Sequence, residues 1–360
     1  MLEPQFLKNK NLHELDTHIT FDEGPHIYTI DGDSNFTSVT TWNHSHFWPF
    51  NADLIIDKMM ASPKWPNNTK YFGMSKDEIK SLWDNNRDEA AAAGTKMHYD
   101  IECFYNDMDV KNDSIEYQYF NNFYNNYKNL KAYRTEWMIY DKELKLAGSI
   151  DMIFENEEGN LEIYDWKRCK EIKKDNAWGK AKTPCINHLP DTNFWHYSLQ
   201  LNTYKAIIEK NYGKKVVNMC LVCLHPDNKN KDFLRFEVPD LSSEIKALFE
   251  YRLLEIKDKR QLDIDNLKYE KGKVLEKIDK NQKAFSKLNN KLRIVNLKLY
   301  ELNNLDDSES EDEVEDEVEV EEKNYNNKLY LVDVKTNEIL DELGNILGKW
   351  EKNIPIISNI

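Results

Sequence analysis

The sequence predicts an α/β fold, with a small mixed sheet flanked by helices and a coiled-coil helical extension at the C-terminal end. Two strand-like runs, 147–154 and 161–167, flank the turn signal Glu157-Glu158-Gly159-Asn160 and therefore predict a hairpin. Residues 215–225 form a near-continuous apolar run, which is typical of a buried strand. Helical patterns separate these strands, and apolar residues from Ile264 to Leu302 recur at spacings of three and four, as in a coiled coil.

The first third of the chain predicts one hairpin, a helix that Thr40 or Thr41 could cap and Pro49 would interrupt, and two further helices. The hairpin covers 26–39, a short helix covers 52–61, and a long helix covers 75–105. Ser75 and Glu78 have the spacing of a capping box, in which each side chain accepts a backbone N–H of the other residue. This pattern fixes the start of the long helix.

The middle of the chain predicts the elements on either side of the central hairpin. Aromatic residues at helical spacing over 114–130 are typical of a helix that packs on a sheet, and 133–140 predicts a strand. After the hairpin, 198–211 predicts a helix in which Gln200 and Tyr204 share a face.

Three charged residues of the central hairpin suggest a reactive site. Asp151 lies on the first strand, and Asp165 and Lys167 lie two residues apart on the second, so the latter two side chains point to one face. If the strands pair, Asp151 can lie opposite Asp165. Two carboxylates and an ammonium around one point are the groups that metal-assisted phosphodiester hydrolysis needs.

Gly148-Ser149-Ile150-Asp151, followed about fourteen residues later by Asp165-Trp166-Lys167, resembles the core of the PD-(D/E)xK nucleases. More narrowly, the chain resembles the RecB-type, lambda-exonuclease-like branch, which has a helical histidine upstream and a Gln-x-x-x-Tyr helix downstream. Gly94-Thr95-Lys96-Met97-His98 and Gln200-Leu201-Asn202-Thr203-Tyr204 match those motifs. The resemblance covers roughly 85–212 and implies a restriction-endonuclease-like core.

The resemblance implies Mg²⁺ or Mn²⁺ as the cofactor and suggests roles for residues of this sequence. The implied metal ligands are His98, Asp151, Asp165 and the carbonyl of Trp166. The implied catalytic residues are Asp151, Asp165, Lys167, which orients the attacking water, and Glu136, an acid of the preceding strand. Mg²⁺ takes oxygen ligands, and a histidine ligand also suits Mn²⁺.

Nucleic-acid contacts are expected beside this site. A basic run follows Lys167, and it is either a phosphate-binding segment or a solvated face. The resemblance places Gln200 and Tyr204 near the active centre or the substrate backbone, and the alternative is an ordinary amphipathic helix. The candidate contacts are Arg168, Lys170, Lys173, Lys174, Gln200 and Tyr204.

The net charge of −15 comes mostly from one segment. Residues 306–322 contain twelve acids and no bases, so the rest of the chain carries a net charge of −3 and local basic patches can still meet phosphate. Five scattered cysteines, the lack of a long apolar run and the lack of an apolar signal-peptide core predict a soluble intracellular protein, cytoplasmic or nuclear, with no membrane partner.

These observations predict a metal-dependent nuclease, in particular a DNA exonuclease of replication, recombination or repair. The alternative is a non-catalytic nucleic-acid-binding or coiled-coil scaffold protein that retains the nuclease fold. The complete set of Asp151, Asp165 and Lys167 favours the enzyme, because a protein that only binds does not need all three. A second D-x-K, Asp333-Val334-Lys335, lacks the neighbouring motifs and predicts a small hairpin instead.

The chain is expected to divide into five segments. They are an N-terminal hairpin and helices that belong to the nuclease module (1–84), the nuclease core (85–240), a coiled-coil region (241–305), a disordered acidic linker (306–323) and a small C-terminal segment (324–360). The apolar seam from Ile264 to Leu302 favours self-association or a partner protein. The alternative is a helical arm that folds onto the nuclease body.

Overall fold

The computed structural model describes residues 4–176, 179–303, 319–325, 328–341, 344, 346–352 and 354–357. The chain divides into two compact units, 1–268 and 269–360. Within the described residues, none of the helices combines the length and the apolar character needed to cross a membrane.

The first unit contains most of the predicted elements. Its N-terminal part holds α1 (Phe6–Lys10), β1 (Ile19–Asp22), β2 (Ile27–Ile30), β3 (Thr37–Ser38), α2 (Val39–His44) and α3 (Ala52–Met60). Its central part holds α4 (Lys76–Tyr105), α5 (Ile115–Asn126), β4 (Lys131–Asp141), β5 (Leu146–Glu155) and β6 (Leu161–Lys167). It ends with α6 (Asn193–Asn211), β7 (Val216–Cys223), β8 (Leu234–Glu237) and the first turns of α7 (Ser242–Asn303). The predicted capping box of Ser75 and Glu78 begins α4.

The N-terminal hairpin differs from the predicted one. β2 pairs antiparallel with β1, which precedes it, and β3 instead joins the main sheet beside β5. The turn of this hairpin contains Gly24 and Pro25, a stronger turn signal than the Asp31-Gly32-Asp33 on which the prediction depended.

The main sheet is mixed, as predicted. Its strands follow the order β3-β5-β6-β7-β8, and β4 pairs with β5 as well. β5 runs antiparallel to both β4 and β6, whereas β6 and β7 run parallel. Parallel neighbours need a long crossover connection, and α6 supplies it here.

The hairpin of β5 and β6 pairs over only part of its length. Its backbone pairing ends at Met152 and Tyr164, one step before Asp151 and Asp165. Beyond that step β6 still pairs with β7. The start of β5 pairs with β3 instead of β6. The two strands therefore separate at the two aspartates, which leaves space for a polar site between them.

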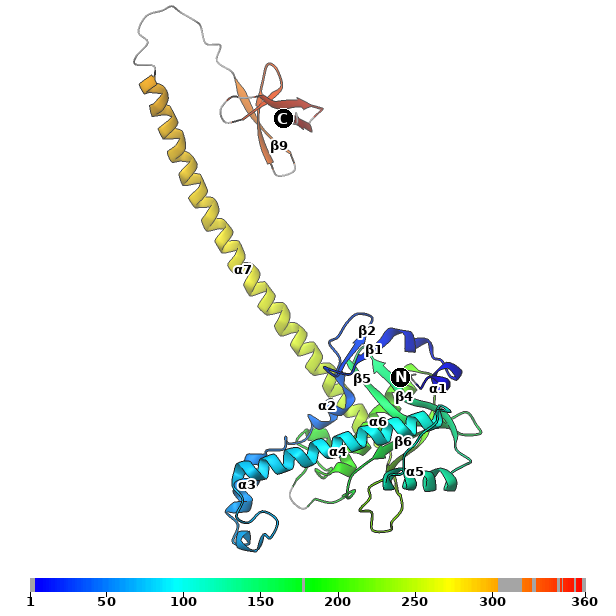
Figure 1. Cartoon of the computed structure of the whole chain (residues 1–360). Helices are drawn as coiled ribbons and strands as arrows, with labels where there is room; N and C mark the ends of the chain where they lie inside the picture. Colours follow the sequence, from blue (N-terminus) through cyan, green and yellow to red (C-terminus); the bar gives the residue numbers. More distant parts are fainter. Residues whose placement is uncertain are drawn as a thin grey trace, which may run out of the picture. The chain divides into compact units, whose positions relative to one another are not determined.

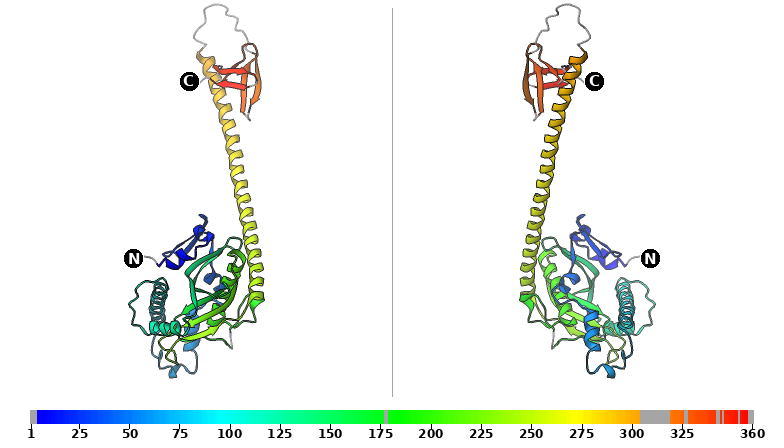
Figure 2. Two further views of the ribbon diagram at one scale, coloured as in Figure 1. Left: turned by 90° about the vertical axis from the view of Figure 1, so that its right-hand side faces the viewer. Right: turned by 90° about the vertical axis from the view of Figure 1, so that its left-hand side faces the viewer.

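Apolar side chains cover both faces of this sheet. One core contains residues of α2, α6 and the start of α7, together with the fully buried Trp137 and Ile163 of the sheet. The other core contains residues of α4 and α5, including Phe120 and Phe123, packed on Trp166. The sheet is the middle layer of three, so α4 and α6 approach it from opposite faces (Figure 1; Figure 2). This arrangement confirms the predicted fold class.

In the structure, the nuclease core extends beyond residue 240, where the sequence predicts that it ends. Leu241, Ile245 and Leu248 are at most 5% exposed and belong to the same core as β6 and β7. The ring centre of Phe249 lies 5.8 Å from that of Trp42. The first turns of α7 are therefore part of the nuclease core. The composition becomes more charged near residue 241, although side chains stay buried as far as Leu248. The predicted boundary followed the composition and therefore lies too early in the chain.

The second unit combines a helix with a small antiparallel sheet. α7 continues through it to Asn303, and the apolar residues of the predicted seam from Val274 onward are exposed. The sheet contains β9 (Val320–Tyr325), β10 (Lys328–Asp333), β11 (Glu338–Leu340), β12 (Ile346–Glu351) and β13 (Ile354–Ile357) in the order β13-β12-β11-β10-β9. Val332, Ile339 and Trp350 form its core.

The structure agrees with the predicted hairpin at the second D-x-K but not with the predicted end of the acidic linker. Asp333 Oδ1 accepts hydrogen bonds from the backbone N–H groups of Lys335 (2.7 Å) and Thr336 (2.9 Å), so the second D-x-K forms the predicted hairpin turn. The predicted linker 306–323 must end earlier, because β9 pairs with β10 from Val320 onward. Residues 306–318 of that linker lie outside the described residues.

Candidate active site

Charged side chains from four elements meet where β5 and β6 separate. They are His98 of α4, Glu136 of β4, Asp151 of β5, and Asp165 and Lys167 of β6. Met97 and Ile101 flank the histidine on α4, are at most 3% exposed and pack that helix on the sheet. Helix packing therefore fixes the position from which His98 reaches the strands.

Glu136 has an unusual backbone conformation for a strand residue. Its φ is +42°, in a region that residues other than glycine rarely adopt. Both of its neighbours pair with β5, and the register places Glu136 opposite Asp151. Ser149 Oγ donates a hydrogen bond of 2.7 Å to the Glu136 carboxylate. The unusual φ thus accompanies a carboxylate that is fixed beside the site.

His98, Glu136 and Asp151 form a compact cluster. One ligating atom of each lies within 4.8 Å of those of the other two. His98 Nδ1 lies 3.5 Å from Asp151 Oδ2 and 3.9 Å from Glu136 Oε1. On the other side of the ring, His98 Nε2 lies 2.9 Å from the carbonyl oxygen of Trp166. The imidazole therefore faces oxygen atoms of β4, β5 and β6 together.

Asp165 and Lys167 form a buried ion pair beside this cluster. Lys167 Nζ lies 2.6 Å from Asp165 Oδ2, and Asp165 is only 2% exposed. The same ammonium lies 4.8 Å from the ring centre of Tyr197 on α6. Asp151 Oδ2 accepts a hydrogen bond of 2.9 Å from the backbone N–H of Trp166, which links β5 to β6 after their pairing ends.

An excess of negative charge shifts the protonation of these groups. Burial alone would lower the pKa of His98, but Asp151 and Glu136 outweigh it and raise that pKa to about 9. Burial raises the pKa of Asp165 to about 6, although Lys167 opposes this shift. Burial would also lower the pKa of Lys167, but Asp165 and Asp151 raise it, so this lysine stays charged at neutral pH.

This set of donors fits a divalent cation. Three carboxylates and one ammonium leave two negative charges uncompensated when His98 is neutral. An imidazole nitrogen with carboxylate and carbonyl oxygens suits Mn²⁺ and Mg²⁺. His98, Glu136 and Asp151 are the residues best placed to hold the ion, with Asp165 and the Trp166 carbonyl next to them. Glu136, which the sequence predicts as a catalytic acid, thus joins the candidate ligands.

α6 supports the site from the opposite face to α4. Gln200 Nε2 donates hydrogen bonds to Tyr204 Oη (3.0 Å) and Thr40 Oγ1 (3.1 Å). Tyr204 is 3% exposed, and a Cβ atom on Gly148 would lie 2.8 Å from its ring. Glycine at this position lets the tyrosine pack against β5. Tyr204 therefore packs against β5 and accepts a hydrogen bond from Gln200, and the contact of these two residues with nucleic acid stays a prediction.

Tyr197 is a site residue that the sequence analysis missed. The predicted helix begins at 198, whereas α6 begins at Asn193, so Tyr197 lies on the helix and supports Lys167. The signal was its spacing of three residues from Gln200, which places both on one helix face. Burial raises the pKa of Tyr197 to about 12, so its ring remains neutral beside the ammonium.

Some of the basic residues predicted to contact nucleic acid form ion pairs with acids of the same chain. Arg168 Nε lies 2.7 Å from Glu116 Oε1, and the arginine side chain is 20% exposed, so its main role is structural. Lys170 and Lys173 are 77% and 64% exposed and form surface ion pairs, which contribute only about 0–1 kcal/mol and yield easily to phosphate. Lys174 Nζ lies 4.6 Å from the ring centre of Phe194.

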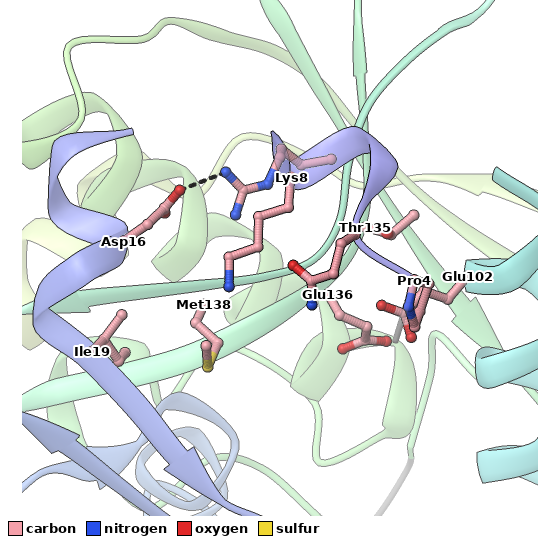
Figure 3. A pocket seen from close by; sticks show the side chains of 10 residues that line it. Pro4, Lys8, Asp16, Ile19, Glu102, Thr135, Glu136 and Met138 are labelled. Atoms are coloured by element: carbon pink, nitrogen blue, oxygen red, sulfur yellow. Dashed lines mark hydrogen bonds and ion pairs between the residues drawn. The ribbon is translucent and has the colours of Figure 1, made fainter. Parts of the chain in front are cut away.

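A cavity of about 170 Å³ lies next to Glu136 (Figure 3). The residues that line it are Pro4, Gln5, Lys8, Asp16, Ile19, Glu102, Arg134, Thr135, Glu136 and Met138. The buried ion pair between Asp16 Oδ2 and Arg134 Nη1, 2.7 Å long, forms part of its wall. The N-terminal segment from Pro4 to Ile19 therefore covers β4 next to Glu136, the third residue of the cluster.

Fold and site together define a nuclease class. Residues 76–317, two thirds of the chain, match the PD-(D/E)XK nuclease superfamily. The chain belongs to this superfamily, whose members are metal-dependent nucleases that act on nucleic acid.

Among solved structures, the chain is similar to one described as "Crystal structure of SSO0001", at 14% sequence identity and a TM-score of 0.25. That similarity covers 71% of this chain and 86% of the other. No curated protein matches the sequence.

Proposed function

We propose that the protein is a Mg²⁺- or Mn²⁺-dependent DNA exonuclease of the RecB-type, lambda-exonuclease-like branch, acting in replication, recombination or repair. The observation that carries the proposal is the meeting of His98, Glu136 and Asp151 beside the Asp165–Lys167 pair. The packing of Tyr204 against Gly148, which joins two of the predicted motifs, supports the assignment to this branch.

The residues of the cluster have distinct proposed roles. His98, Glu136 and Asp151 hold the cation, with Asp165 and the Trp166 carbonyl adjacent to it. A bound divalent cation supplies Lewis-acid activation of the phosphate and of water. The Ser149 hydroxyl holds Glu136 in place, because it donates to the carboxylate from the neighbouring strand.

Lys167 acts on the reacting atoms from β6, beside the cluster. Asp165 keeps it charged and directs its ammonium, which also lies 4.8 Å from the ring centre of Tyr197. A lysine in this position donates hydrogen bonds to the attacking water and to the negative charge that develops on the phosphate oxygens. Its low exposure, 17% of the side chain, keeps bulk water from screening that interaction.

The exposed seam of α7 supports a further proposal, that this chain self-associates or binds a partner protein through 264–302. Apolar side chains such as Val274, Leu288 and Leu292 are 55–63% exposed at coiled-coil spacing. Sedimentation of the full chain and of a variant with Leu288→Glu and Leu292→Glu tests it. A chain that is monomeric in both forms at micromolar concentration refutes self-association.

The proposed activity is tested by incubating the purified chain with linear and closed circular DNA, each single- and double-stranded, with Mg²⁺ or Mn²⁺. An exonuclease degrades only the linear substrates, in a reaction that EDTA stops. Asp151→Asn serves as the inactive control. Binding without degradation of any substrate would favour a non-catalytic protein that retains the nuclease fold.

A further inference from the structure

We propose that Cys169 and Cys223 are a site of reversible oxidation, at which a peroxide links the two sulfurs and thereby slows cleavage. Cys169 lies two residues after the end of β6, and Cys223 is the last residue of β7. The effect on cleavage rests on the proposed nuclease function, whereas the formation of the disulfide does not.

The two thiols are neighbours in space although they are 54 positions apart in the chain. Cys169 Sγ lies 3.9 Å from Cys223 Sγ, and both cysteines are free. A disulfide has a sulfur–sulfur distance of about 2.05 Å, so the sulfurs need to approach each other by about 1.9 Å. A movement of this size needs no rearrangement of the sheet, because Cys169 lies outside the strands.

The sheet places this pair beside Lys167. β6 and β7 run parallel, and their register sets Lys167 opposite Cys223. The backbone N–H of Leu224, the next residue, donates a hydrogen bond of 2.8 Å to the carbonyl oxygen of Lys167. The backbone of Lys167 therefore leads directly to one sulfur of the pair and is bonded to the chain that carries the other.

The two sulfurs differ in their access to solvent. Cys223 is fully buried, and β7 lies between β6 and β8 in the sheet. Cys169 is partly exposed, so a small oxidant reaches the pair from this side. A hydrogen bond from the Cys169 thiol lowers the pKa of Cys223 to about 7, although burial opposes this shift. Part of the pair is thus deprotonated at neutral pH, and the thiolate is the form that attacks a peroxide.

The oxidation takes place in two steps with hydrogen peroxide as the oxidant. The thiolate attacks one peroxide oxygen, so that a sulfur–oxygen bond forms, the oxygen–oxygen bond breaks, and the released hydroxide takes up a proton to become water. The second thiol then attacks the sulfenic sulfur, forms the sulfur–sulfur bond and expels a second water. Two thiols are oxidised to one disulfide, and one peroxide is reduced to two waters.

The disulfide should displace Lys167. Because β7 is held by a strand on either side, the movement that closes the bond falls on Cys169 and on the two peptide units that join it to Lys167. The ammonium of Lys167 then no longer keeps its 2.6 Å contact with Asp165. A misplacement of about 1 Å in a site of this kind lowers the rate about a hundredfold.

The same geometry makes the bond easy to reduce. The reduced chain holds the sulfurs 3.9 Å apart, so the fold opposes the short distance that the disulfide requires. Strained disulfides are reduced more readily than relaxed ones, and they are the ones used in regulation. A dithiol should therefore restore the reduced chain and its rate of cleavage.

The test treats the full chain with hydrogen peroxide in EDTA, removes the peroxide with catalase, and analyses unreduced peptides by mass spectrometry. The expected product is a peptide pair linked through Cys169 and Cys223. After Mg²⁺ is added, the single-turnover rate on linear DNA should be about a hundredfold lower, and dithiothreitol should restore it. The absence of the linked peptide at peroxide concentrations that oxidise the exposed Cys185 would overturn the proposal.

Single variants assign the loss of rate to this pair. Cys169→Ser, at a partly exposed position, should cleave as the reduced wild type does and keep that rate after peroxide. Cys223→Ala should behave in the same way, and its thermal melt shows whether this buried position tolerates the change. Cys185→Ser is the matched control and should remain sensitive to peroxide. An equal loss of rate in Cys169→Ser and the wild type would place the damage elsewhere and overturn the proposal.

Hydrogen exchange separates this proposal from the proposed function. The amide of Leu224 donates to Lys167, so it should exchange faster in the linked chain than in the reduced chain. A linked chain that cleaves at the reduced rate would overturn the proposed displacement. A reduced chain that cleaves nothing, but that forms the linked peptide with faster exchange at Leu224, would refute the nuclease proposal and leave the oxidation site standing.

Discussion

Replacing Lys167 by alanine is the most informative single change in the site. The substitution removes an ammonium that lies 2.6 Å from Asp165 and 4.8 Å from the Tyr197 ring, and it touches none of the three clustered ligands. Cation binding should therefore survive in Lys167→Ala. In Asp151→Asn it should fail, because a neutral amide is a poor ligand for a hard cation.

The expected loss of rate follows from the role of the ammonium. A preorganised donor to developing negative charge contributes about 3–4 kcal/mol, so kcat should fall by roughly 10² to 10³. Asp165 is affected as well. Its pKa is already raised to about 6 by burial, and Lys167 opposes that shift, so removing the lysine raises the pKa further. In the metal-free variant, Asp165 should consequently stay protonated to higher pH than in the wild type.

Single-turnover cleavage of end-labelled linear DNA at saturating Mg²⁺ measures the rate, and calorimetric titration measures cation affinity. Lys335→Ala, in the second D-x-K, is the matched control and should cleave normally, because that lysine lies in a hairpin turn. The reasoning is refuted if Lys167→Ala keeps more than a tenth of the wild-type rate, or if it loses cation binding as Asp151→Asn does.

Three other predictions concern protonation and stability. The pKa of His98 is about 9 in the metal-free protein, so cation binding at pH 7 should release close to one proton, and the cation affinity should rise with pH up to 9. Calorimetry in buffers of different ionisation enthalpy measures the number of protons released. Cation binding without proton release would contradict this prediction. A fragment 1–239 should not fold, because it lacks Leu241, Ile245 and Leu248, each of which contributes about 2–5 kcal/mol to the free energy of unfolding. A fragment 1–268 should instead unfold in one cooperative thermal transition. Folding of the shorter fragment would show that the core ends at residue 240. Asp16→Asn should lower stability at pH 7 by about 3–5 kcal/mol, because it breaks a buried pair with Arg134. Partners of Asp16 hold its folded pKa below 3.8 against burial, so wild-type stability from this group should be lost as pH falls below about 4, and a flat acid profile would argue against it.

Most of the candidate site could be predicted because its motifs are local. Asp165 and Lys167 are separated by one residue on a strand, and the hairpin turn brings Asp151 opposite them. The helical histidine entered through its resemblance to a known motif. The structure places all of these side chains around one point, with His98 3.5 Å from Asp151. Side-chain alternation and the turn signal were sufficient for Asp151, Asp165 and Lys167, whereas His98 needed the resemblance to a known motif.

Features that depend on tertiary packing could not be predicted in the same way. The positive φ of Glu136 occurs opposite Asp151, and no pattern in β4 signals it. Tyr204 shares a helix face with Gln200, but only the contact with Gly148 shows that its ring is buried. The burial of Leu241 and Ile245 likewise depends on a core formed by distant strands.

The charge balance of the site explains why these residues belong together. Glu136 and Asp151 are partly exposed and Asp165 is buried, and the convergence of three carboxylates is unfavourable without compensating positive charge. The metal-free protein compensates with protons, on His98 and in part on Asp165. Both nitrogens of the His98 ring face oxygen atoms, so the imidazolium stands among the atoms that a cation would bind. In the proposed reaction, a bound divalent ion would replace that proton, while Lys167, paired with Asp165, would remain positively charged. The same surplus of carboxylates therefore sets the affinity for the metal and its dependence on pH.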